Sequence, residues 1–151
     1  MNMKAGAAAI LCVACLLMAG CTSSNQDEEL RETIKDSLSA IQLKMSDLGQ
    51  DATNLNYAGL IRSGSALETE SQIWYNKISA INDISSDWQP VKTNYLKALD
   101  YFGTAGKQAS DASLAFQRGD NTAAIQYLEE ATINIDKGGR YLDEATAAIP
   151  Q

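Results

Sequence analysis

The side chains that could do covalent or metal chemistry are few in this chain. It contains no histidine, which removes the commonest general base and the commonest metal ligand. Its three cysteines are Cys12, Cys15 and Cys21, all close to the start of the sequence. Acidic pairs such as Glu129-Glu130 are neighbours on the polar face of an expected helix, where carboxylates are usually solvated. We therefore expect no enzymatic activity, no metal site and no cofactor.

Composition narrows the class of protein further. The chain has 151 residues, of which 45% are apolar, so it is long enough and hydrophobic enough for one folded domain. Acidic residues number 19 and basic residues 12, which gives a net charge of −7. Because no excess of positive charge is available to neutralise phosphates, we expect no nucleic-acid partner.

The N-terminal segment has the layout of a targeting signal. A single positive charge at Lys4 precedes an apolar run over residues 5–19, which is short for a comfortable membrane span. The run ends in the sequence Leu17-Met18-Ala19-Gly20-Cys21, and the polar residues Thr22-Ser23-Ser24 follow. Small residues before a cysteine leave the backbone open to a peptidase, and the thiol can form a thioether to a lipid.

This ending resembles the lipobox of prokaryotic lipoproteins, with Met18 at a position more often filled by leucine. The resemblance implies a signal peptide over residues 1–20 and a lipid attached to Cys21, which would become the new N-terminus. It also implies a protein anchored to the cell membrane and facing the extracytoplasmic side. Cys12 and Cys15 form a CxxC that would leave with the signal peptide. An uncleaved signal anchor, or a secretory signal with a chance cysteine, remains the alternative.

Beyond a short linker over residues 21–26, the sequence predicts an all-α domain over residues 27–150. Apolar residues recur at steps of three and four in four segments, which is typical of amphipathic helices. We expect helices over 27–48, ended by Gly49, and over 52–84, with a possible kink at Ser63–Ser65. The third is capped by Ser86-Asp87, with Pro90 in its first turn, and ends at Phe116. The fourth runs from a cap at Asp120 to about Ile149.

Short turns between these segments predict an antiparallel, up-down-up-down four-helix bundle with heptad spacing. Small residues recur every seven positions in the last two helices, which predicts that these two pack closely. They are Ala98, Ala105 and Ala112 in the third helix, and Ala124, Ala131, Gly138 and Ala145 in the fourth. The alternative is that the small residues leave room for a ligand between helices.

Three aromatic residues are candidate contact sites. If the second helix is longer than the first, the turn that follows it returns toward the anchor, so Trp88 is expected close to the lipid headgroups. Tyr127 and Tyr141 lie seven residues apart on the flank of the fourth helix, and tyrosine is favoured at binding surfaces. The same aromatic residues could equally shield the core.

Two functions of different class follow. The first is a membrane-anchored, non-catalytic module that binds or scaffolds another envelope protein. The alternative is a sensor or carrier that binds a small ligand between helices, which a cavity at Gly64, Ser71 or the small-residue rows would favour. The sequence does not decide the oligomeric state or the partner.

Overall fold

The structure, a computed structural model, describes residues 25–150 and contains four long α-helices. Helix α2 spans Asn25–Thr53, α3 spans Tyr57–Ser79, α4 spans Gln89–Gln117 and α5 spans Asn121–Ala147. A single turn of 3-10 helix, η1 (Ser86–Trp88), leads into α4. No strand occurs between residues 25 and 150, so the predicted all-α class and four-helix bundle are confirmed.

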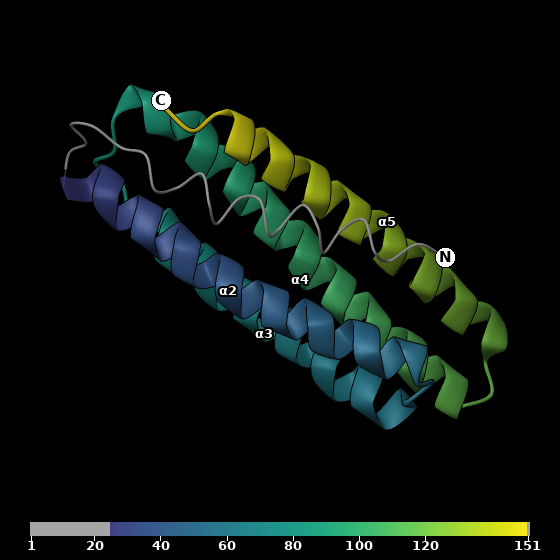
Figure 1. Cartoon of the computed structure of the whole chain (residues 1–151). Coiled ribbons are helices and arrows are strands. Elements are labelled where there is room, and N and C mark those ends of the chain that lie inside the picture. The colour runs from purple at the N-terminus through teal and green to yellow at the C-terminus, as the bar shows by residue number, and fades with distance from the viewer. Residues whose placement is uncertain (1–24, 151) are drawn as a thin grey trace.

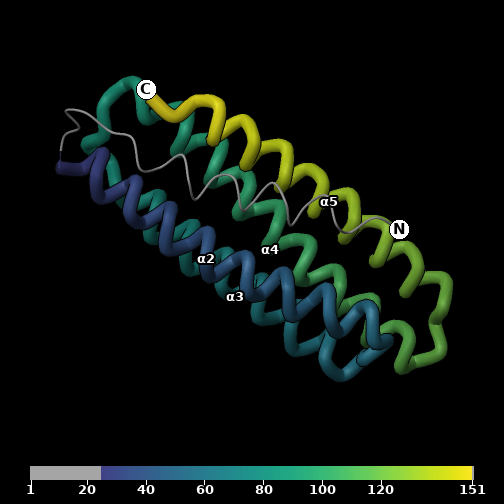
Figure 2. Tube along the Cα trace, in the orientation of Figure 1, coloured from purple at the N-terminus to yellow at the C-terminus, as the bar shows by residue number. Residues whose placement is uncertain are grey.

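The helices run alternately up and down and lie side by side (Figure 1). Helix α4 is central, because α3 packs along one of its sides and α5 along the other, whereas α2 packs mainly on α3. The start of α2, the α3–α4 connection and the end of α5 lie at one end of the bundle (Figure 2). The α2–α3 and α4–α5 turns lie at the opposite end.

Large apolar side chains of α2, α3 and α4 fill one continuous core. Leu30 and Ile34 on α2, Leu67 and Ile78 on α3, and Leu99 on α4 are all at most 2% exposed. Ser37 on α2 and Tyr95 on α4 share a hydrogen bond of 2.6 Å within this core. Helix α2 is therefore held to α4 by side-chain contacts, although the two backbones seldom approach each other.

The predicted close packing of the last two helices is confirmed. Ala98, Ala105 and Ala112 on α4 are completely buried, as is Ala124 on α5. At Gly138 a Cβ atom would stand 2.6 Å from a ring carbon of Phe102, so the phenyl ring occupies the space that a larger residue would need. The rows of small residues thus serve helix packing and leave no room for a ligand along this seam.

A second close approach joins α3 to α4 through Gly64 and Gly106. A Cβ on either glycine would lie 2.5 Å from the carbonyl oxygen of the other, which only glycine avoids. Helix α3 runs unbroken through residues 63–65. Gly64 lies where α3 meets α4, and its lack of a side chain lets the two backbones approach closely.

Two helix boundaries differ from the prediction. Gly49 does not end the first helix, because α2 continues to Thr53, whose hydroxyl donates to the Gly49 carbonyl at 2.8 Å. The turn falls at residues 54–56 instead, where Leu55 has a φ of 52° and the Asn56 side chain caps α3 by accepting from the Gly59 N–H.

The second helix is shorter than predicted at both ends, with 23 residues against 29 for α2. Its last turn is closed by Lys92 of α4, whose ammonium donates to the carbonyls of Ser79 and Ile81. Residues 80–85 therefore form a connection, not a helix, although Ile81 and Ile84 remain buried as the apolar pattern required.

The predicted caps have mixed outcomes. Asp120 caps α5 by accepting from the Ala123 N–H at 3.0 Å, and Gly119 has a φ of 78°, as a tight turn there requires. Asp27 is 2% exposed, and its carboxylate accepts from the Ser85 N–H at 2.8 Å, which ties the start of α2 to the α3–α4 connection. The Ser86-Asp87 cap is wrong, since α4 begins after η1 without a side-chain cap.

Candidate functional site

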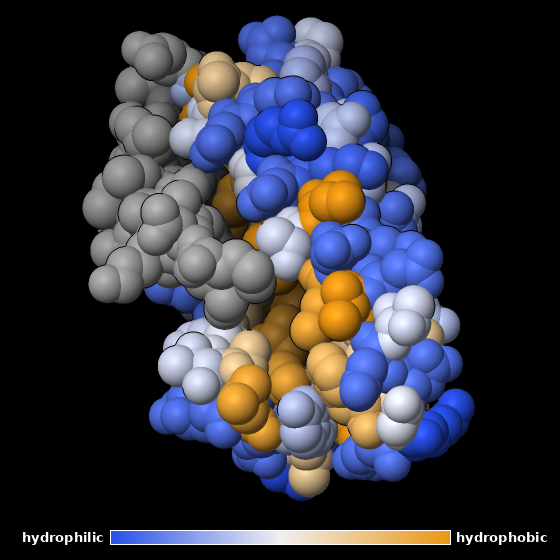
Figure 3. All heavy atoms as spheres, turned by 90° about the vertical axis from the view of Figure 1, so that its right-hand side faces the viewer, coloured by the Kyte–Doolittle hydropathy of each residue, from blue (hydrophilic) through white to orange (hydrophobic). Residues whose placement is uncertain are grey.

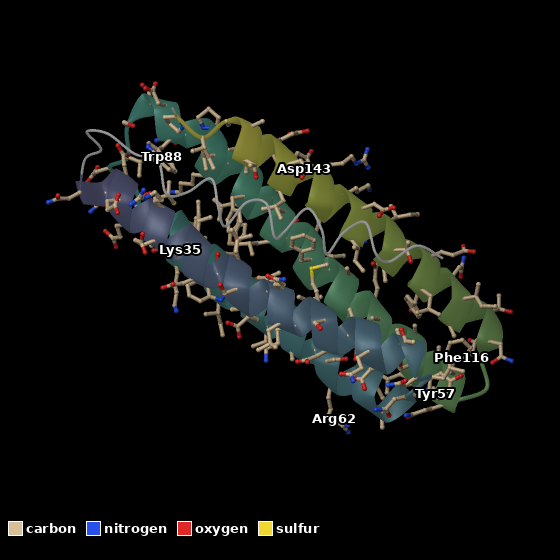
Figure 4. The ribbon with its side chains drawn as sticks, viewed as in Figure 1. Lys35, Tyr57, Arg62, Trp88, Phe116 and Asp143 are labelled. Atoms are coloured by element: carbon tan, nitrogen blue, oxygen red, sulfur yellow. The ribbon has the colours of Figure 1, made fainter. Side chains whose placement is uncertain are left out.

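Of the residues proposed for membrane attachment, Cys21 and the signal segment over 1–20 lie outside the described residues. Trp88 lies at the end of the bundle where α2 begins, far from Tyr57 and Phe116 at the other end (Figure 4). The predicted excess length of the second helix is wrong, because α3 is the shorter helix, so the membrane contact of Trp88 stays a prediction. Its side chain belongs to the hydrophobic core and is only 8% exposed, so neighbouring protein covers the ring.

The two candidate tyrosines of α5 have different surroundings. Tyr127 is 37% exposed and lies on the surface. Tyr141 is half-buried and stacks on Tyr101 of α4, with ring centroids 5.5 Å apart and planes within 7° of parallel. Lys97 lies over the Tyr141 ring, 4.9 Å from its centroid, and Lys137 over the Tyr101 ring at 5.4 Å. Tyr141 is thus part of the α4–α5 contact, whereas Tyr127 stays at the surface.

The bundle is open on the side where α2 and α5 would complete it. In the described part of the chain these two helices make almost no contact, whereas each packs well on one neighbour. Leu128 and Ile135 occupy heptad positions of α5 but are only half-buried, and they do not belong to the apolar cluster that forms the core. The space-filling view shows a hollow with apolar atoms on part of one face, between more polar surfaces (Figure 3).

We call this opening the α2–α5 groove. Its half-buried apolar side chains are Met45 on α2 and Leu128 and Ile135 on α5, whereas Leu38, Phe102 and Ala109 belong to the buried core.

A row of acidic residues follows the α5 side of the groove. Glu129, Asp136 and Asp143 each come one residue after a large apolar residue of the heptad, and all three are exposed. The opposite flank of α5 is formed by the residues that come just before those apolar positions, such as Asn134. It faces the other side of α4, where the Asn134 amide donates to the Gln108 side chain at 2.7 Å. The acidic row therefore lies on the flank toward α2. None of the three forms an ion pair with another residue in the range 25–150.

A separate cavity of about 380 Å³ lies between α3 and α4. It is lined by polar and charged side chains together with Leu99 and Gly103. These polar residues are Glu68, Ser71, Gln72 and Tyr75 on α3, and Asp100, Thr104 and Lys107 on α4. We call it the α3–α4 cavity. Of the positions where the sequence allowed for a cavity, Ser71 borders one, whereas Gly64 is filled by the α4 backbone.

The ionic groups of this cavity are partly engaged. Lys107 is paired with Asp111 one turn further along α4, and the hydrogen bond to that carboxylate raises the pKa of the Lys107 ammonium. Glu68 adds a smaller attraction in the same direction. The ammonium is therefore charged and already occupied, and the remaining carboxylates of the lining have no cation of their own among the described residues.

Sequence reasoning missed both features. Leu128 and Ile135 fall in the heptad pattern of α5, which shows which residues face inward but not whether another helix covers them. Sequence reasoning did not select Glu68 or Asp100, which look like ordinary surface carboxylates. Gly103 is the sequence feature that could have indicated the α3–α4 cavity, because a glycine inside a helix leaves space beside its neighbour.

No group of three or more potential metal ligands occurs among the described residues, and no helix there is long and apolar enough to cross a membrane. No family model matches this chain, and neither a curated protein nor a solved structure is significantly similar to it. The class that the fold defines is thus an all-α four-helix bundle with one open side.

Proposed function

We propose that this protein is a non-catalytic interaction module of the cell envelope, held at the membrane by a lipid on Cys21. Its partner is another envelope protein, which places an amphipathic helix in the α2–α5 groove. The observation that carries the proposal is the open side of the bundle, where Leu128 and Ile135 follow the heptad pattern of a packed seam but stay half-buried and outside the core cluster.

The shape of the groove favours a helix as the occupant. It runs along α5, which has 27 residues and is therefore about 40 Å long. Its walls carry apolar residues at heptad spacing, the pattern into which the apolar face of a second helix packs. A helix placed there would complete the fourth side of the bundle and cover the half-buried side chains.

Charge specifies the partner helix further. The row Glu129, Asp136 and Asp143 would lie beside one flank of the occupant at intervals of seven residues. In helix pairs such flanking positions select partners through opposite charges. We therefore expect lysine or arginine at heptad spacing on the partner's flank that faces α5. A second copy of this chain does not meet that expectation well, because its own net charge is −7.

The anchor gives the groove an orientation. Cys21 precedes Asn25, the first residue of α2, by four positions, which span at most about 14 Å of extended chain. The lipid would hold the start of α2 close to the membrane, with the Asp27–Ser85 end of the bundle beside it. The turns at Asn56 and Gly119 would then point away from the surface, and the groove would run between the two ends.

Native mass spectrometry on protein gently extracted from its own membranes tests this proposal. We expect a chain that begins at a lipid-modified Cys21 and is bound to one copy of another protein. The Ile135→Glu variant, which places a charge in the groove, should lose the partner and keep the lipid. The matched control is Ile133→Glu, two residues away and 52% exposed, which should keep both.

Three outcomes would overturn the proposal. They are a chain without lipid, a wild-type protein that carries no partner, and equal loss of the partner in the two variants. A homodimer in place of a second protein would reject the expected partner and identify this chain as the occupant.

A further inference from the structure

Gly139 is a helical glycine that the packing of the described residues does not require. It lies in the interior of α5 without a positive φ, and a Cβ atom placed there would meet none of their atoms within 4 Å. Gly64 and Gly106 are needed because a Cβ on either would strike the carbonyl of the other, and Gly138 is needed because a Cβ would stand 2.6 Å from the Phe102 ring. Since glycine weakens the interior of a helix relative to alanine, Gly139 lowers the stability of the free protein without a packing reason inside it.

Helical register places Gly139 in the α2–α5 groove. It follows Ile135 by four residues and Asp136 by three, so it lies on the same face of α5, one turn further along. The residue before it, Gly138, faces Phe102 of α4. Because each residue advances about 100° around a helix, Gly139 is turned from α4 toward the flank that carries Asp136.

The residues seven positions before and after Gly139 are also small. They are Thr132 and Thr146, which register places along the same strip of α5. The Thr132 hydroxyl donates to the Leu128 carbonyl at 2.9 Å, and the Thr146 hydroxyl donates to the Leu142 carbonyl at 2.8 Å. Because both hydroxyl groups are bound to their own helix, these side chains offer short methyl groups to the groove. The α5 wall of the groove therefore projects least at Gly139.

The contact between α3 and α4 shows what such a position allows. At Gly64 and Gly106 the two backbones come so close that a Cβ on either residue would lie 2.5 Å from the carbonyl oxygen of the other. Small residues at a crossing let helix axes approach more closely than the usual ~8–10 Å. One side of such a contact is present at Gly139, and the occupant of the groove would supply the other.

We propose that Gly139 is the point of closest approach between α5 and the helix bound in the α2–α5 groove, and that it sets how deeply this helix is seated. This role of Gly139 depends on the proposed function and specifies the contact more closely. The strip is small over two heptads and not at one position alone, which fits the approach of a whole helix better than the insertion of a single side chain. Gly139 thus selects the partner by size, whereas the acidic row selects it by charge.

Native mass spectrometry on protein extracted from its own membranes, together with unfolding of the purified variants, tests this role. Gly139→Ala should make the free protein more stable, yet its partner should dissociate on dilution at a roughly tenfold higher concentration, because a methyl group stands where the partner helix lies. Gly139→Leu should keep the helical circular dichroism of the wild type and lose the partner. The control Gln126→Leu adds the same bulk on the exposed outer face of α5, seven residues before Ile133, and should keep the partner.

The opposite signs of the two effects distinguish this role from a purely structural one, since a glycine that served only the fold would lose stability when it is replaced. If Gly139→Leu binds the partner as well as the wild type or better, while Ile135→Glu loses it, the groove is occupied and the role of Gly139 is wrong. If both variants keep the partner, or the wild type carries none, the proposed function fails too. Loss of the partner from Gln126→Leu would also overturn the role, because added bulk anywhere on α5 would then suffice.

Discussion

Replacing Ser71 by alanine should stabilise the protein, which is unusual for a change in a buried position. The hydroxyl of Ser71 is removed from water without a hydrogen bond in return, a loss of about 1–3 kcal/mol. Alanine removes that penalty and is a better helix former by a few tenths of a kcal/mol. We expect the free energy of unfolding to rise by about 1–2 kcal/mol and Tm by roughly 3–8 °C for a domain of this size.

Chemical denaturation monitored by circular dichroism measures the effect, with Ser113→Ala as the control. Ser113 is also completely buried in a helix, but it donates to the Ala109 carbonyl at 3.2 Å. Both variants gain the same helix propensity, so the difference between them isolates the unsatisfied hydroxyl. A Ser71→Ala protein that is no more stable than Ser113→Ala would refute the reasoning.

Three further changes probe the bundle itself. Gly64→Ala should lower the free energy of unfolding by about 3 kcal/mol or more, because its Cβ would lie 2.5 Å from the Gly106 carbonyl oxygen of α4. Gly139→Ala should raise it by up to about 1 kcal/mol, because no atom of the described residues lies within 4 Å of the added Cβ. Urea unfolding compares the two variants. Burial raises the pKa of the Tyr95 phenol, so above pH ~10 the unfolded chain releases a proton that the folded protein keeps, and stability falls as pH rises. In unfolding measured from pH 8 to 11, Tyr95→Phe should show a smaller fall, and an equal fall would contradict the burial argument. Asp27→Ala should lower the unfolding free energy by about 2 kcal/mol and speed amide exchange at Ser85, because the connection loses the carboxylate that holds it; unchanged exchange would reject that role.

The helical pattern was predictable because each helix buries one face at a regular period. The small-residue rows of α4 and α5 could likewise be identified by their spacing. The ends of α3 could not, since they depend on contacts made across the fold. Lys92 closes the last turn of α3 from the next helix, and Asp27 binds a residue 58 positions away. The heptad pattern continued through Ile81 and Ile84 because both are buried, although their backbone is not helical.

The groove and the surroundings of the candidate aromatic residues were harder to predict from the sequence, for a related reason. Ile135 has the same pattern as a core residue, and only the arrangement of the helices shows that nothing in residues 25–150 covers it fully. Trp88 was expected at the membrane from a length argument that the true end of α3 removes. Tyr141 was one of two equivalent flank residues in the sequence, but its partner Tyr101 lies 40 positions earlier and was not foreseen.

The central claim is that the α2–α5 groove holds a helix of another protein, and site-specific photocrosslinking in intact cells tests it most directly. A photoreactive residue at Leu128 should crosslink to one protein, at a segment whose sequence is an amphipathic helix with basic residues on one flank. The same probe at Leu43, which is 58% exposed on the outer face of α2, should give no such product. Changing Glu129, Asp136 and Asp143 together to their amides should reduce the Leu128 product. Equal crosslinking from both positions, or a product indifferent to the acidic row, would contradict the account.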